Sequence, residues 1–214
     1  MLGLICCCLN QDGMDKRMDQ DYLVIARWKG ILVQTSPKTL YLSKEIHMTN
    51  IKFREAIYAD LNRIVEIYNS TIASRMVTAD LEPVSVESRN NWFYEHNAKH
   101  RPLWILEMED KTVGWLSFQS FYGRPAYNAT AEISIYLDPT VRGKGLGKIV
   151  LEYAINEAPS LGIKTLLGFI FSHNEPSLKL FRHFDFEEWA NLPNIAQLDD
   201  MERGLIIMGK RITP

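Results

Sequence analysis

Cysteine is nearly missing from this sequence, since Cys6, Cys7 and Cys8 are adjacent and residues 9 to 214 contain none. The main body therefore lacks a cysteine nucleophile, a CxxC zinc site and a disulfide framework, which is typical of a chain in a reducing cytoplasm. An apolar run of about 18 to 20 residues is also missing, so we expect a soluble chain without a membrane span. The first residues lack a cationic start and a small-residue cleavage site, which argues against a secretory signal.

An excess of charge of either sign is absent as well. The formal net charge of the 214 residues is −2, and Lys and Arg are spread along the chain. A nucleic-acid partner is therefore not expected. With 46% hydrophobic and 23% charged residues, the composition is that of an ordinary globular domain with a sizeable core.

Two parts of the sequence meet near Met48. Residues 20–42 contain short strand-like apolar runs around Lys29 and Gly30, which are too short to bury a core alone. We therefore expect residues 1–47 to be an N-terminal extension, either disordered or the product of a misassigned start, and residues 48–214 to form the domain.

From Ile51 onward, strand-like and helix-like patterns alternate, with hairpins as well as crossovers. This order predicts an α+β domain with a mixed, largely antiparallel sheet flanked by helices. Asp60 and Ser85 are the predicted caps of the first two helices. Strands are expected at 51–56, 102–108, 112–121, 131–138, 163–172, 186–190 and 204–212, and helices at 59–72, 85–100, 146–162 and 174–184.

The stretch VRGKGLGK, residues 141–148, follows a predicted strand and opens a predicted helix. It does not fit a P-loop, because Lys148 stands where the second glycine is needed and no hydroxyl follows, and its glycines are not spaced GxGxxG. Alternating glycines can aim several backbone N–H groups at one anion beside a helix N-terminus, with cationic side chains around it. The stretch therefore predicts a pyrophosphate site, and the alternative is a solvated basic turn.

The same residues resemble the GNAT-type N-acetyltransferase superfamily, whose pyrophosphate motif Q/R-x-x-G-x-G/A is matched by RGKGLG at 142–147. GRPAYNATAEISIYL, which begins at Gly123, is similar to the phosphinothricin acetyltransferase branch, and Asn174, Ser177 and Leu180 match N-x-x-S-x-x-L. The resemblance covers residues 51 to about 211 and implies the GNAT-like acyl-CoA N-acyltransferase fold. It also implies acetyl-CoA as co-substrate, a small-molecule amine as acceptor and a homodimer. The cofactor-binding residues that it implies are Ile135, Tyr136, Leu137, Arg142, Gly143, Lys144, Gly145, Leu146, Gly147, Lys148 and Asn174.

Glu132 matches the base of this family. An α-ammonium group has a pKa of about 7.7 to 8.0 and must lose a proton before acetyl transfer, whereas a free glutamate, at about 4.3, is a weak base for this step. Partial burial or an ordered water would make Glu132 more effective. The backbone N–H near Ile135 can stabilise the oxyanion. Phe181 stands where many relatives carry a tyrosine and some a histidine, so no general acid is assigned, and Tyr136 and His183 are only neighbours in sequence.

The resemblance assigns acceptor binding to the loop before Glu132. Arg124 can hold an acceptor carboxylate or phosphinate, and Tyr127 shapes the pocket. Asp199, Asp200 and Glu202 replace the basic C-terminal run of the branch, which leaves the acceptor open among phosphinothricin, methionine sulfoximine or sulfone, and other amines. The substrate-binding residues that the resemblance implies are Arg124, Tyr127, Thr130, Ala131 and Glu132.

Three functions are consistent with these features. The first is an N-acetyltransferase for small amino-acid-like amines, with Glu132 as base. An acetyl-CoA sensor without turnover is suggested by Phe181, and acetylation of protein amines would need an open groove for a peptide. His96 and His100, four residues apart, lack a third ligand and are expected on a solvated helix face, so no metal is predicted. Trp92, Trp104 and Trp115 are expected in the core.

Overall fold

The computed structural model describes residues 24–28, 31–35 and 51–212 and divides the chain into two compact units. In the smaller unit, β1 (Val24–Trp28) and β2 (Ile31–Thr35) form an antiparallel pair. The rest of the predicted extension, residues 1–23, 29–30 and 36–47, lies outside the described residues, so the division at residue 48 stays a prediction.

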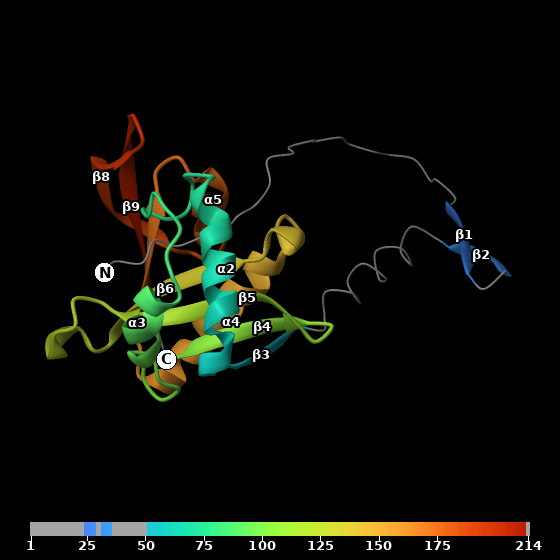
Figure 1. Ribbon diagram of the computed structural model, residues 1–214, viewed down its shortest axis with the longest axis horizontal. Helices are drawn as coiled ribbons and strands as arrows, with labels where there is room; N and C mark the ends of the chain where they lie inside the picture. The colour runs from blue at the N-terminus through green and yellow to red at the C-terminus, as the bar shows by residue number, and fades with distance from the viewer. Residues whose placement is uncertain (1–23, 29–30, 36–50, 213–214) are drawn as a thin grey trace. The chain divides into compact units, whose positions relative to one another are not determined.

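The larger unit is built on a seven-stranded sheet with the order β3-β4-β5-β6-β7-β9-β8 (Figure 1). Every neighbouring pair is antiparallel except the central pair, β6 and β7, which the helix α4 connects. This arrangement confirms the predicted mixed sheet. The strands are β3 (Lys52–Glu55), β4 (Leu103–Met108), β5 (Lys111–Ser120), β6 (Thr130–Leu137), β7 (Thr165–Phe171), β8 (Glu187–Leu198) and β9 (Met201–Arg211).

Four α-helices accompany the sheet among the described residues, together with short 3₁₀ turns that include η1 (Tyr58–Asp60) and η2 (Glu87–Arg89). None of these helices is long and apolar enough to cross a membrane. The α-helices are α2 (Leu61–Ile72), α3 (Asn90–Tyr94), α4 (Leu146–Glu157) and α5 (Glu175–His183).

Both sheet faces carry packed aromatic side chains. On one face, Ile64 and Ile67 of α2 pack against Trp115 and Tyr136, whose rings stack with centroids 4.3 Å apart. Because side chains alternate along a strand, Trp104 points the opposite way from Ile105, which belongs to the first cluster. There the Trp104 ring meets Tyr153 of α4 at 5.4 Å. The sheet is thus enclosed between α2 and α4.

The structure corrects three details of the predicted elements. Helix α3 ends at Tyr94, so His96 and His100 lie beyond it rather than on a helix face. Asp60 stands at the N-cap position of α2, as predicted, but its side chain makes no capping hydrogen bond to that helix. Its carboxylate instead accepts from the Ile57 N–H and pairs with Arg54, which closes η1. Strands β8 and β9 are longer than predicted, because the polar stretch between them forms a hairpin.

Candidate active site

The parallel strands β6 and β7 separate partway along their length. Their parallel pairing joins Thr130 with Thr165, Ala131 with Leu166 and Glu132 with Leu167, and the ladder ends there. Asp138 donates its N–H to Val113 O on β5, at 2.8 Å. Because backbone groups alternate in direction along a strand, those of Ile133, Ile135 and Leu137 face the side from which β7 has diverged. This leaves a row of β6 backbone groups directed into the opening.

The glycine-rich loop lies at the end of this row. Gly143 and Gly145 have φ values of 73° and 84°, a left-handed conformation in which a side chain is strained. Gly145 precedes the first residue of α4, so backbone N–H groups of the first helical turn, at the positive end of the helix dipole, lie next to it. The backbone here therefore has a form that suits an anion, and the roles of Gly143, Gly145, Leu146 and Gly147 in holding the cofactor stay predictions.

The predicted cations of the loop differ in their contacts. Arg142 donates from Nε to Leu137 O at 2.9 Å and from Nη2 to Ser70 Oγ at 2.8 Å. The Nζ of Lys144 lies 2.8 Å from Thr140 O, and Lys148 is exposed. Arg142 thus closes the end of the opening between β6 and β7, while the two lysines are accessible to an anion.

Asn174 is buried and serves as a cap. Its Oδ1 accepts from Ser177 N at 3.2 Å at the start of α5, and its Nδ2 donates to Met76 O at 2.9 Å. The amide is thus occupied by two protein partners, and its predicted contact with the cofactor stays a prediction.

Glu132 sits at the last position at which β6 pairs with β7. Only 3% of its surface is exposed, and its buried Oε1 has no hydrogen-bond partner among the residues that the structure describes. Removal from water penalises the carboxylate and raises the pKa of Glu132 to about 8, from an ordinary value of 4.5. A carboxyl group that titrates near neutral pH is chemically suited to proton transfer.

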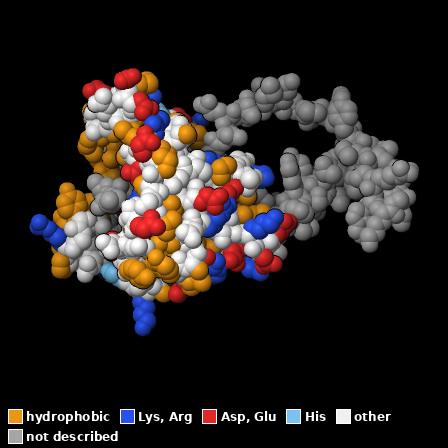
Figure 2. All heavy atoms as spheres, viewed as in Figure 1, with side chains coloured by type: hydrophobic (Ala, Val, Ile, Leu, Met, Phe, Trp, Pro, Cys, Tyr) orange, Lys and Arg blue, Asp and Glu red, His pale blue; other side chains and the backbone are white. Residues whose placement is uncertain are grey.

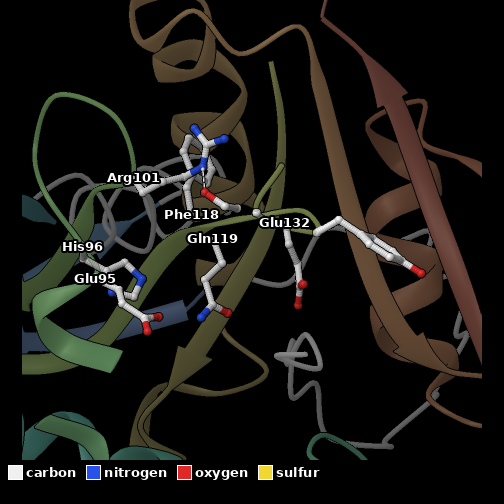
Figure 3. Close-up of a pocket in the computed structure, with 9 residues that line it drawn as sticks. Glu95, His96, Arg101, Phe118, Gln119 and Glu132 are labelled. Carbon is white, nitrogen blue, oxygen red and sulfur yellow. Dashed lines mark hydrogen bonds between the residues drawn. The ribbon is translucent and has the colours of Figure 1, made fainter. Parts of the chain in front are cut away.

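A cavity of about 630 Å³ opens beside Glu132 (Figure 3). Gln119 lies directly opposite Glu132 across the β5–β6 pair, so the two side chains share one face of the sheet. The sequence reasoning missed Gln119, although the strand register would have indicated it. The cavity is lined by Glu95, His96, Arg101, Phe118, Gln119, Ser120, Tyr122, Gly123 and Glu132.

His96 contributes a largely buried, neutral ring to the wall. Its burial lowers the pKa of the ring to about 4. The contact of its Nδ1 with Trp92 O, 2.8 Å away, raises the pKa but has the smaller effect. Because His96 lies in the cavity wall, its predicted location on a solvated helix face was wrong. The described part of the chain contains no group of three His, Cys, Asp or Glu residues arranged to hold a metal.

The predicted acceptor loop borders the cavity through different residues than expected. Tyr122 and Gly123 line the cavity, whereas Arg124 and Tyr127 are not part of its wall, and all four of these residues are exposed. Ala131 alternates with Glu132 and so points to the opposite face of β6. Of the predicted substrate-binding set, Glu132 is the member that lines the cavity, and the roles of Arg124, Tyr127, Thr130 and Ala131 stay predictions.

The C-terminal segments are buried core or hairpin. Phe181 is fully buried against Phe186, with ring centroids 4.7 Å apart. Its phenyl ring has no acidic proton to donate. Asp199 occupies the turn between β8 and β9, where it pairs with Arg75 at 2.9 Å. Figure 2 shows acidic side chains gathered at this tip, and cationic and acidic groups interspersed over the rest of the visible face.

Comparisons with known proteins agree with this geometry. The family model described as "Acetyltransferase (GNAT) family" matches residues 63–186. The chain is 53% identical over 161 residues to "Putative phosphinothricin acetyltransferase YwnH" of Bacillus subtilis, with 75% of this chain and 98% of the relative covered.

More distant relatives extend the same similarity. The chain is 28% identical to "L-methionine sulfoximine/L-methionine sulfone acetyltransferase" of Pseudomonas paraeruginosa, over 67% of this chain and 84% of the relative. A solved structure of a GNAT superfamily phosphinothricin acetyltransferase from Sinorhizobium meliloti, in complex with acetyl-CoA, has a TM-score of 0.72 at 25% identity, with 77% of this chain and 89% of that chain covered.

Proposed function

The chain belongs to the acetyltransferase (GNAT) family and is an acetyl-CoA-dependent N-acetyltransferase; from this premise we propose that it acetylates a small amino-acid-like amine with Glu132 as the base. The observation that carries the proposal is the buried Glu132 carboxyl, whose pKa is raised to about 8, in the wall of a cavity beside the separating strands.

The opening between β6 and β7 fits acetyl-CoA. The N–H groups around Gly143 and Gly145 suit the pyrophosphate, and the backbone groups of Ile133, Ile135 and Leu137 suit the amides of the pantetheine arm. When bound, acetyl-CoA supplies the activated acetyl thioester. The Ile135 N–H, which faces the opening, is the proposed donor to the oxyanion.

Proton transfer to Glu132 is nearly balanced in free energy. The pKa of Glu132, about 8, is close to that of an α-ammonium group, about 7.7 to 8.0. A carboxylate with the ordinary value of 4.5 would accept this proton about 3000-fold less favourably. Burial beside the cavity therefore makes Glu132 an effective base for this class of amine.

The cavity favours a small acceptor over a protein chain. About 630 Å³ accommodates an amino acid analogue, and we propose acceptors of the phosphinothricin or methionine sulfoximine class, in keeping with the relatives' names. Arg124 and Tyr127 are proposed to cover the acceptor from the loop. We also propose residues 48–214 as the catalytic domain, a homodimer as the assembly and the cytoplasm as the location.

The test is thiol release from acetyl-CoA with a panel of amines: phosphinothricin, methionine sulfoximine, methionine sulfone, ordinary amino acids and a lysine peptide. We expect turnover with members of the first three and a loss of kcat of about 100-fold or more in Glu132→Gln. Activity that is indifferent to this substitution would eliminate Glu132 as base.

A sensor without turnover is the second candidate, because buried Phe181 supplies no acid to the leaving thiolate. It predicts calorimetric binding of acetyl-CoA with no amine-dependent thiol release. Turnover with any amine of the panel excludes it.

A further inference from the structure

Arg101 is a buried cation at the wall of the cavity, and neither its residue type nor its place before a strand indicated a role. Only 3% of its surface is exposed. Removal from water lowers the pKa of its guanidinium, so the fold bears a cost for keeping this charge inside. A neutral residue at this position would avoid this cost, so we infer that the charged guanidinium has a role that a neutral side chain would not fill.

The guanidinium donates to both ends of the acceptor loop, residues 121–129. At the start of the loop, Nε donates to Ser120 Oγ at 3.1 Å. At its end, Nη2 donates to Asn128 O at 2.9 Å and to Thr130 O at 3.1 Å. One side chain therefore joins the last residue of β5 to the first residue of β6, two positions before Glu132.

Arg101 is itself held firmly. The Arg101 N–H donates to Asn97 O at 3.1 Å, and the Asn97 N–H donates to Arg101 O at 2.9 Å. The Nη1 of Arg101 also donates to His100 O at 2.9 Å. The next residue, Pro102, accepts from Phe118 N at 3.0 Å. The clamp is thus anchored on the same segment that carries His96 into the cavity.

The clamped loop holds one residue, Tyr122, in a strained backbone conformation at the cavity. Tyr122 and Gly123 both have left-handed φ values, 57° and 61°, and both line the cavity. A tyrosine in this conformation persists only where the surroundings hold it. The hydrogen bonds of Arg101 at the two ends of the loop are suited to hold it.

We propose that Arg101 is a positioning residue: it holds the 121–129 loop closed over the cavity and fixes the start of β6, and so aligns the acceptor with Glu132. The inference rests on the proposed function, because it takes this cavity as the acceptor site. A hydrogen bond between charged and neutral groups in such a place is stronger than one between neutral groups, which suits a clamp.

The experiment compares Arg101→Gln and Arg101→Lys with the wild type, with Arg182→Gln as a control that removes an exposed arginine from α5. We expect Arg101→Gln to raise the KM of the best acceptor between about tenfold and 100-fold, because small misplacements near the reacting atoms are costly. The KM of acetyl-CoA should change less than about twofold, since its loop lies at the other end of β6. Lysine keeps the charge but cannot bridge both ends, so it should restore little.

Chymotrypsin cleavage after Tyr122, which is 74% exposed, reports the loop without any need for activity. Cleavage should accelerate in Arg101→Gln and, to a smaller extent, in Ser120→Ala, which removes one acceptor and preserves the charge. Ser120→Ala keeps the test decisive if Arg101→Gln does not fold. Unchanged cleavage with an unchanged acceptor KM, or an equal rise in the KM of acetyl-CoA, would overturn the proposal. If the wild type turns over no amine, the proposed function fails, and the cleavage rates still decide whether Arg101 clamps the loop.

Discussion

Replacement of Glu132 by glutamine should make the protein more stable at alkaline pH. The wild-type carboxyl is buried, and its pKa is raised by burial to about 8 from an ordinary 4.5. Between these two values the unfolded chain has lost this proton while the folded chain still binds it. Its contribution to stability is therefore complete below about pH 4.5 and is lost as the pH rises through about 8.

The size of the effect follows from the two pKa values. The free energy of unfolding of the wild type should fall, relative to Glu132→Gln, by at most about 1.4 kcal/mol per pH unit across this window, or about 5 kcal/mol in all. Glutamine has nearly the same volume and stays neutral, so the difference between the two proteins isolates the titration of Glu132. Groups that titrate identically in both proteins cancel.

The assay is urea unfolding of both proteins at pH 5, 7 and 9, with the difference in unfolding free energy plotted against pH. The kcat/KM of the wild type should also rise with pH through an apparent pKa near 8. A stability difference that stays constant over this range would refute the assigned burial of Glu132 as a neutral acid, and with it the account of how this residue becomes an effective base.

Three further predictions concern the cofactor loop, the cap of α5 and the cavity wall. Gly145→Ala should lower the unfolding free energy by about 1 kcal/mol and raise the KM of acetyl-CoA, because φ is 84° there. The control Gly162→Ala, with φ of 69° and open space around it, should cost similar stability and leave that KM unchanged. Equal effects of the two substitutions on the KM of acetyl-CoA would contradict the anion site. Asn174→Ala should lower the unfolding free energy by about 2 kcal/mol in urea titrations through loss of the cap and of the bond to Met76, while an unchanged calorimetric affinity for acetyl-CoA would show that its role is structural. In the wild type, stability should fall by at most about 1.4 kcal/mol per pH unit as the pH drops from 6.5 to about 4, because the buried His96 ring does not gain the proton that the unfolded chain gains. His96→Leu should remove this loss. If the stability of this variant falls with pH in parallel with that of the wild type, His96 is not buried as a neutral ring.

Much of the fold was predictable because local patterns and short-range pairing set it. The turn at Asp110, the helix after Gly145 and the strand that ends before Pro139 are each encoded by neighbouring residues, and the structure contains all three. The long helix predicted through His100 failed because Arg101 and Asn97 form a backbone bridge that helical periodicity does not reveal. That bridge also brings His96 to the cavity.

By itself, the sequence indicated an anion site, because a site built from glycines and a helix N-terminus depends on consecutive residues. The family and its acetyl donor followed from the resemblance of short motifs, which are also runs of neighbouring residues. Only the tertiary structure decided how Glu132 becomes a suitable base, since its pKa depends on how completely distant elements exclude water. The same holds for Gln119 and Arg101, which reach the cavity through strand register and loop closure. Contacts between residues far apart in the chain are set by packing, and no local pattern records them.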